Sequence, residues 1–257
     1  MQPDPLLASL PDWAFAFAVV LARVSAAVMV LPGLGESEAP AVVRAGLAIG
    51  ISALILPGVV HLIPSSGEAP LRILALVAGE LLVGLLLGWL AKLMALALPV
   101  AGQIVAMQIG LSSVLQPDPD LGPQTAGTSR LLAMAGPVLI LSTGLYAMPL
   151  DALSGSYRLF PPGTLLPAGD AAQSVAEATG AFFALALRLS APLLIAGLIW
   201  QTMLGLLARL VPSLQVYSLA MPGQVLGGLL VFGLVLKQIL DVWIGSVSAA
   251  FATLPGL

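Results

Sequence analysis

The chain has 257 residues, of which 59% are hydrophobic and only 8% are charged, and its mean hydropathy is +1.07. Soluble domains carry about 25% charged residues, so this composition excludes a water-facing globular surface and predicts an integral membrane protein. The net charge of −3 gives no sign of nucleic-acid binding, and the lack of cysteine excludes disulfides, thiolate catalysis and cysteine-ligated metals.

Long apolar runs predict an all-α protein. A helix needs about 20 apolar residues to cross a bilayer, and Pro or Gly marks the breaks between runs. Residues 99–115 are also apolar enough to be helical, although their end is polar. The N-terminus has no basic residue, so the first run is predicted to be a retained helix rather than a signal peptide. The predicted spans are residues 13–31, 40–63, 71–97, 130–150, 175–211 and 222–251.

The run at residues 175–211 is too long for a single crossing. At 1.5 Å per residue it would reach about 55 Å, against a hydrocarbon core of about 30 Å. Pro192 interrupts the run. The sequence therefore predicts that the helix bends there, continues out of the membrane, or folds back as a hairpin.

A polar gap at residues 107–123 separates two apolar runs. Non-helical backbone at membrane depth must be buried in protein or line a watery cavity. The gap is therefore either a surface loop between two spans or an internal element of an assembly. Asp118 and Asp120 lie in it among prolines, where turn and helix-cap roles are the ordinary expectation.

Charged residues occur inside the predicted helices. Arg23, Glu80 and Arg188 lie in apolar runs, where a central charge costs about 2.5–3.5 kcal/mol on insertion scales. Such a charge requires a partner, and we expect Arg23 and Glu80 to form a buried ion pair between helices or subunits. A transport pathway and snorkelling to the interface are the alternatives.

Small residues recur every fourth position on three helices. Glu80, Gly84 and Gly88 share one helix face, which should meet another helix closely. Similar pairs occur at residues 46 and 50 and at residues 223 and 227. Ordinary helix packing is the expected role of all three faces, with a specific subunit interface as the alternative.

The sequence carries no sign of catalysis. Its single histidine cannot make a metal site alone, and no phosphate-binding, nucleophile-elbow or dinucleotide motif is present. We therefore predict a non-enzymatic protein that needs no metal and no cofactor.

Several motifs occur along the chain in a fixed order. They are Leu-Ala-Arg-Val at residues 21–24, Pro-x-x-Val-Arg at 40–44, the face of Glu80, Gly84 and Gly88, Ala-Gly-Gln-Ile-Val-Ala-Met-Gln-Ile-Gly-Leu-Ser at 101–112, Asp-Pro at 118–119, and residues 204–217 with Arg209 and Pro212. Together they resemble the FliR family, membrane proteins of the flagellar and type III secretion export gate. Residues 142–144, Ser-Thr-Gly, stand where many relatives carry an Asn-Gly-His-like turn before the next helix.

This resemblance implies an architecture. It implies a single membrane domain over residues 1–257, built of helical hairpins that resemble a fusion of FliP-like and FliQ-like folds. One copy would complete a closed ring with FliP-type and FliQ-type subunits, beside FlhB-type and FlhA-type export proteins, in the inner membrane at the flagellar basal body. Unfolded flagellar subunits would pass through. Much of the assembly would stand outside the bilayer plane.

The resemblance also implies two groups of site residues. The internal loop at 107–123 would plug the channel, and its apolar side chains would exclude water from a narrow pore. The plug residues are Met107, Gln108, Ile109, Gly110, Leu111, Ser112, Val114, Leu115, Asp118 and Pro119. The assembly residues are Arg23, Arg44, Glu80, Gly84, Gly88, Arg209 and Pro212.

Three functions remain open at this point. The first is an export-gate component, with the flagellar system favoured over a virulence-type system. The second is a small-solute transporter in which residues 107–123 form a re-entrant substrate site. The third is a membrane scaffold subunit without a pore.

Overall fold

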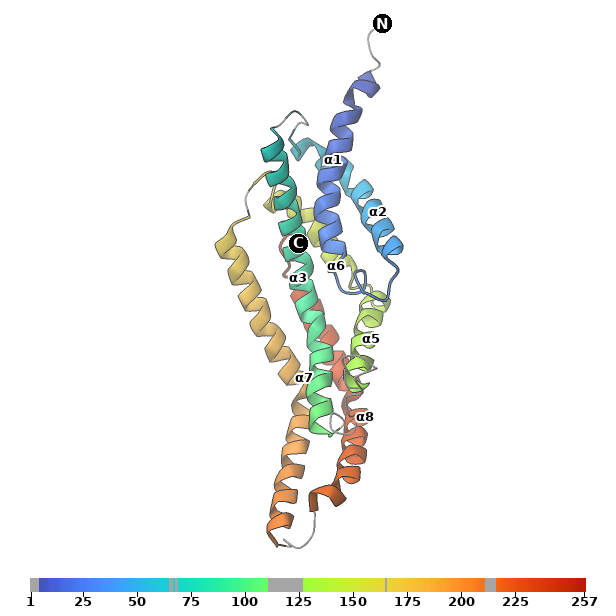
Figure 1. Cartoon of the computed structure of the whole chain (residues 1–257), viewed down its shortest axis with the longest axis vertical. Coiled ribbons are helices and arrows are strands. Elements are labelled where there is room, and N and C mark those ends of the chain that lie inside the picture. Colours follow the sequence, from blue (N-terminus) through green and yellow to red (C-terminus); the bar gives the residue numbers. More distant parts are fainter. Residues whose placement is uncertain (1–4, 65–66, 68, 111–126, 165, 211–215) are drawn as a thin grey trace. The chain divides into compact units, whose positions relative to one another are not determined.

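The computed structural model describes residues 5–64, 67, 69–110, 127–164, 166–210 and 216–257. Its elements are the helices α1 (Pro5–Val28), α2 (Ala41–Val59), α3 (Pro70–Gln108), α5 (Gly127–Ser142), α6 (Ala147–Leu159), α7 (Ala168–Leu210) and α8 (Val216–Phe251), with a short 3-10 helix at Val60–Leu62. Figure 1 traces them along the chain. The predicted all-α class is confirmed.

Most predicted spans correspond to helices. Within the described residues, five helices are long and apolar enough to cross a membrane, and α5 with α6 would make a sixth, broken crossing. At about 1.5 Å per residue, α3, α7 and α8 reach about 55–65 Å, roughly twice the hydrocarbon thickness. These three helices therefore extend well beyond a bilayer core.

The span predicted at residues 130–150 is wrong as one helix. The structure has α5 and α6 instead, bent by 69° at a short break. Gly144 lies in the break with φ +76°, a left-handed conformation that glycine adopts without steric cost. The break begins within residues 142–144, where many relatives carry an Asn-Gly-His-like turn before the next helix.

Two prolines lie inside continuous helices. Pro99 lies within α3, which joins the run at 71–97 to residues 99–108 in one helix. Pro192 lies within α7, so the hairpin alternative for that run is wrong. Membrane helices tolerate proline where neighbouring side chains satisfy the freed backbone groups. Near Pro99, side chains from α5 and α8 bond to α3 carbonyls: Ser129 Oγ donates to the Pro99 carbonyl at 2.9 Å, and Trp243 Nε1 donates to the Met94 carbonyl at 3.3 Å.

The chain packs as two compact units. One comprises Met1–Leu93, Ile140–Thr179 and Ser248–Leu257, and the other comprises Met94–Leu139 and Gly180–Val247. The prediction of a single membrane domain stays a prediction.

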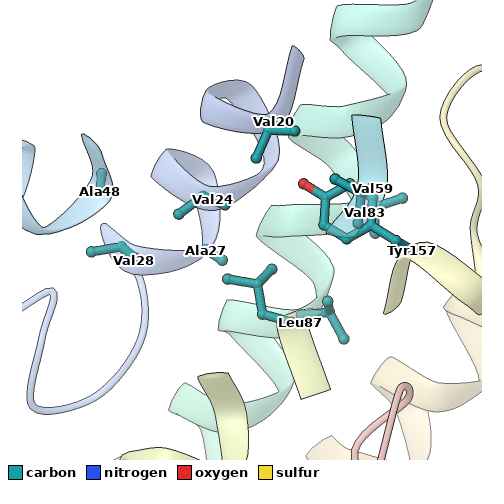
Figure 2. Packing of buried hydrophobic residues seen from close by; sticks show 10 residues of the cluster. Val20, Val24, Ala27, Val28, Ala48, Val59, Val83, Leu87 and Tyr157 are labelled. Carbon is teal, nitrogen blue, oxygen red and sulfur yellow. The ribbon is translucent and has the colours of Figure 1, made fainter. Parts of the chain in front are cut away.

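The core of the first unit brings α1, α2, α3 and α6 together. Figure 2 shows its buried side chains, to which α1 contributes four residues, Val28 among them on the side of Ala48 of α2. The members are Val20, Val24, Ala27, Val28, Ala48, Val59, Val83, Leu87, Leu153 and Tyr157. α1 also packs directly along α2 (Figure 1). Arg23 of α1 and Glu80 of α3 are buried on the same helices, whereas Arg188 of α7 is exposed and belongs to the other unit.

The second unit has its own core. Trp243 of α8 is completely buried, and its ring packs beside Gly136 of α5, at an ordinary contact distance of 3.6 Å from where a Cβ would be. Leu98, Leu132 and Leu189, from α3, α5 and α7, are also buried. These contacts hold the C-terminal part of α3, and with it the start of the predicted plug.

Candidate functional site

Arg23 of α1 and Glu80 of α3 form a buried ion pair. Arg23 Nε donates to Glu80 Oε2 at 2.7 Å, and Nη2 donates to Oε1 at 2.8 Å. The exposed fraction is 0% for Arg23 and 2% for Glu80. Two parallel charge-assisted bonds are a strong arrangement for a guanidinium and a carboxylate. The predicted buried pair between helices is confirmed, and both partners belong to this one chain.

The guanidinium of Arg23 also holds the end of α6. Nη1 donates to Ser156 Oγ at 3.0 Å, and Nη2 donates to the Phe160 carbonyl at 2.7 Å. The ring of Tyr157 lies against the guanidinium, 3.9 Å from its centroid, so a cation–π contact is added. One side chain thereby joins α1, α3 and α6.

Gly84 and Gly88 bring the backbones of α3 and α1 into contact beside this pair. A methyl group on Gly84 would overlap the Arg23 carbonyl oxygen and lie 3.0 Å from Ala26 Cβ. One on Gly88 would lie 2.9 Å from the Ala27 carbonyl oxygen. The predicted close meeting of this face with another helix is confirmed. The two glycines place Glu80 at bonding distance from Arg23.

The second glycine pair has no close neighbour in the described part of the chain. Cβ atoms built on Gly46 and Gly50 of α2 would meet nothing within 4 Å. Ala48 between them is buried, so α2 packs on one face and leaves the face of the two glycines open. Its packing role stays a prediction.

We predict that Gly84→Ala lowers stability by about 1–3 kcal/mol, the usual effect of overpacking. The added methyl would push α3 away from α1 and stretch the ion pair. The temperature at which half of the chain aggregates on heating of freshly solubilised membranes, followed by immunoblot without purification, measures the effect. Gly46→Ala on α2 is the matched control, because its methyl enters open space. Equal aggregation temperatures for the two variants would contradict the close-approach role.

The predicted plug begins where α3 ends. Met107 is 64% exposed, whereas Ile109 is 3% exposed, so the helix end has one open side and one packed side. Gly110 follows with φ +80°, a left-handed conformation common just after helices. The Gln108 carbonyl accepts a bond from Gln224 Nε2 of α8 at 3.0 Å. Leu111, Ser112, Val114, Leu115, Asp118 and Pro119 lie outside the described residues.

Comparison with known proteins covers nearly the whole chain. The model of a family described as "Bacterial export proteins, family 1" matches residues 14–250. The chain belongs to this family. Similar proteins include the flagellar biosynthetic protein FliR of Caulobacter vibrioides, which is 31% identical over 229 residues that cover 88% of this chain and 90% of that protein. The resemblance to the FliR family is thereby confirmed.

Relatives from two kinds of system support the same membership in the bacterial export family. The flagellar biosynthetic protein FliR of Bacillus subtilis is 30% identical over 210 residues, or 80% of each chain. The Yop proteins translocation protein T of Yersinia pestis is 31% identical over 215 residues, again 80% of each chain. With its membrane-length helices, this member of the family is a multi-pass membrane protein.

The structure brings some of the export-family motifs together and leaves others apart. The first-helix arginine and the third-helix face of Glu80, Gly84 and Gly88 meet directly. Arg44 is half-buried on α2, and its Nε is buried with no bonding partner among the described residues. Arg209 is exposed near the end of α7, and Pro212 lies outside the described part of the chain. Their assembly roles stay predictions.

Sequence reasoning missed the residues that complete the Arg23 network, namely Ser156 and Tyr157 of α6 and Phe160, which follows the helix. One signal was available. A guanidinium has five N–H donors, more than a single carboxylate satisfies in bidentate geometry, so a buried arginine requires further acceptors. Nothing in one sequence showed which helix would supply them.

Proposed function

We propose that this chain is a non-enzymatic subunit of the flagellar type III protein export gate. It forms part of the membrane channel for unfolded flagellar subunits and helps to seal that channel. The family match over residues 14–250 carries this proposal, because relatives matched over 80–90% of their length are named as flagellar biosynthetic proteins. The proposed location of the subunit is the inner membrane, at the flagellar basal body.

We propose FliP-type and FliQ-type subunits as its direct partners, with FlhB-type and FlhA-type proteins beside them. Surfaces left open in the chain support an assembled state. Val42 and Leu54 of α2 are each 83% exposed, next to Gly46 and Gly50, which have open space before them. The buried, unpaired Nε of Arg44 on the same helix also favours a further acceptor from outside the described residues.

We assign the seal to residues 107–123. The described start of this segment supports the assignment in two ways. α3 ends at a glycine with left-handed backbone, which lets the chain leave the helix sharply. Met107 offers an exposed, flexible apolar side chain at that point.

Copurification tests the proposed function. Expressed alone, the chain should aggregate or run as mixed species in detergent. Expressed with FliP-type and FliQ-type partners, it should enter one monodisperse complex, measured by size-exclusion chromatography with light scattering. FliP-type and FliQ-type proteins expressed without the chain are the control. A chain that is stable alone and binds a small solute would instead be a transporter.

A further inference from the structure

The C-terminal end of α3 fits into a slot between α7 and α8. Gln108 and Ile109 line a cavity of about 180 Å³ together with Gly197 and Trp200 of α7, and with residues of α8 that include Gly228. All of these residues belong to the same compact unit. Three independent contacts hold the helix end there.

The first contact is steric and involves the backbone. A Cβ on Gly228 would overlap Ile109 Cγ2, and would lie 2.6 Å from Ile109 Cβ and 3.3 Å from Ile109 Cα. Isoleucine is β-branched and has little rotamer freedom, so it cannot turn away. Only glycine at residue 228 lets Ile109 lie where it does.

The second contact is on the opposite helix. A Cβ on Gly197 of α7 would overlap the Gln108 side chain at Cγ and Nε2. Two glycines from different helices therefore leave space for the last residue of α3 and for the residue that follows it. Other glycines of these helices do not serve this purpose, since Cβ atoms on Gly205 and Gly233 would meet nothing within 4 Å.

The third contact is a hydrogen bond. Gln224 Nε2 donates at 3.0 Å to the carbonyl of Gln108, the last residue of α3. The last four carbonyls of a helix lack intrahelical partners, so this bond satisfies a group that would otherwise need water. Gly110, with its left-handed backbone, follows two residues later.

We propose that Gly197, Gln224 and Gly228 are positioning residues that anchor the end of α3, and thereby fix where the chain leaves this helix at Gly110. The inference rests on the proposed sealing function, which it deepens. A displaced helix end would displace whatever follows it, so loss of the anchor should loosen the seal without dismantling the assembly.

Cysteine labelling tests the anchor itself. The chain has no native cysteine, so a single Ile109→Cys reports on one position. Its Cβ would still lie 2.6 Å from a methyl on residue 228. In the complex with FliP-type and FliQ-type partners, we expect Gly228→Ala to raise the labelling rate about fivefold or more, as overpacking opens the slot. Gly233→Ala on the same helix is the control. Equal rates in both backgrounds would overturn the anchor.

Ion leak tests the consequence. In membranes containing the same complexes, Gly228→Ala should raise passive ion flux several-fold at unchanged complex yield, whereas Gly233→Ala should not. Faster labelling without a leak would overturn the positioning role. If Gly228→Ala prevents assembly, Gln224→Ala carries both measurements, since it removes the bond without adding volume. A variant lacking residues 110–116 separates the two proposals. If the deletion leaks ions and the anchor variants do not, only this inference fails. If the deletion does not leak either, the proposed sealing function fails.

Discussion

Deletion of residues 110–116 is expected to make membranes that hold the assembled gate leaky to ions. Narrow pores are closed by apolar surfaces that exclude water, and Leu111, Val114 and Leu115 supply such surface in this segment. Conductance across planar bilayers with the reconstituted complex measures the leak. Complex yield should match that of the unchanged protein, because the ion pair that joins α1, α3 and α6 lies elsewhere in the chain.

A replacement of the same length separates loop length from chemistry. Glycine and serine in place of residues 110–116 keep the chain connection but remove the apolar groups. If apolar contact seals the channel, this variant should leak as the deletion does. Unchanged conductance in the deletion, with the complex intact, would rule out the sealing role.

Loss of either partner of the buried ion pair should be the most damaging point substitution. Arg23→Ala or Glu80→Ala leaves an uncompensated buried charge, which costs about 3–5 kcal/mol. Glu80→Ala also leaves two guanidinium bonds unmade, and Arg23→Ala frees α6 from α1 and α3. The yield and thermal stability of the complex should fall sharply in both variants.

An exposed pair in the same chain is the matched control. Lys237 Nζ and Asp241 Oδ2 of α8 are 3.2 Å apart, and the two side chains are 90% and 57% exposed. Exposed pairs contribute about 0–1 kcal/mol, so Lys237→Ala should change stability little. The double variant Arg23→Met with Glu80→Leu should recover part of the loss, because it leaves no buried charge. Equal stability of Glu80→Ala and Lys237→Ala would contradict the structural role of the buried pair.

Much of the site around Arg23 follows from local pattern and energy. A charge in an apolar helix requires a partner, and only a few opposite charges are available in so apolar a chain. The four-residue spacing of Glu80, Gly84 and Gly88 places them on one face whatever the rest of the fold does. These two facts were enough to predict the pair and the close helix contact.

Helix boundaries were harder to predict, since prolines and glycines act differently according to their neighbours. Pro99 does not end α3, which continues to Gln108 with side chains of α5 and α8 bonded to the carbonyls of Pro99 and Met94. The run predicted at 130–150, in contrast, breaks after Ser142, where Gly144 adopts a left-handed backbone between α5 and α6. A hydropathy pattern shows neither the side chains around Pro99 nor the backbone conformation of Gly144.

Composition, the spacing of charges and small residues, and the order of the motifs by themselves determined the membrane class, the family and the Arg23–Glu80 pair. These features depend on transfer energies and helical periodicity, which are properties of the local sequence. Only the tertiary structure decided that α6 completes the arginine network and that Gly46 and Gly50 of α2 face open space. It also decided that Gly197, Gln224 and Gly228 hold the end of α3. Each of these joins residues far apart in the chain through steric fit and hydrogen-bond geometry, which one sequence does not encode in any local pattern.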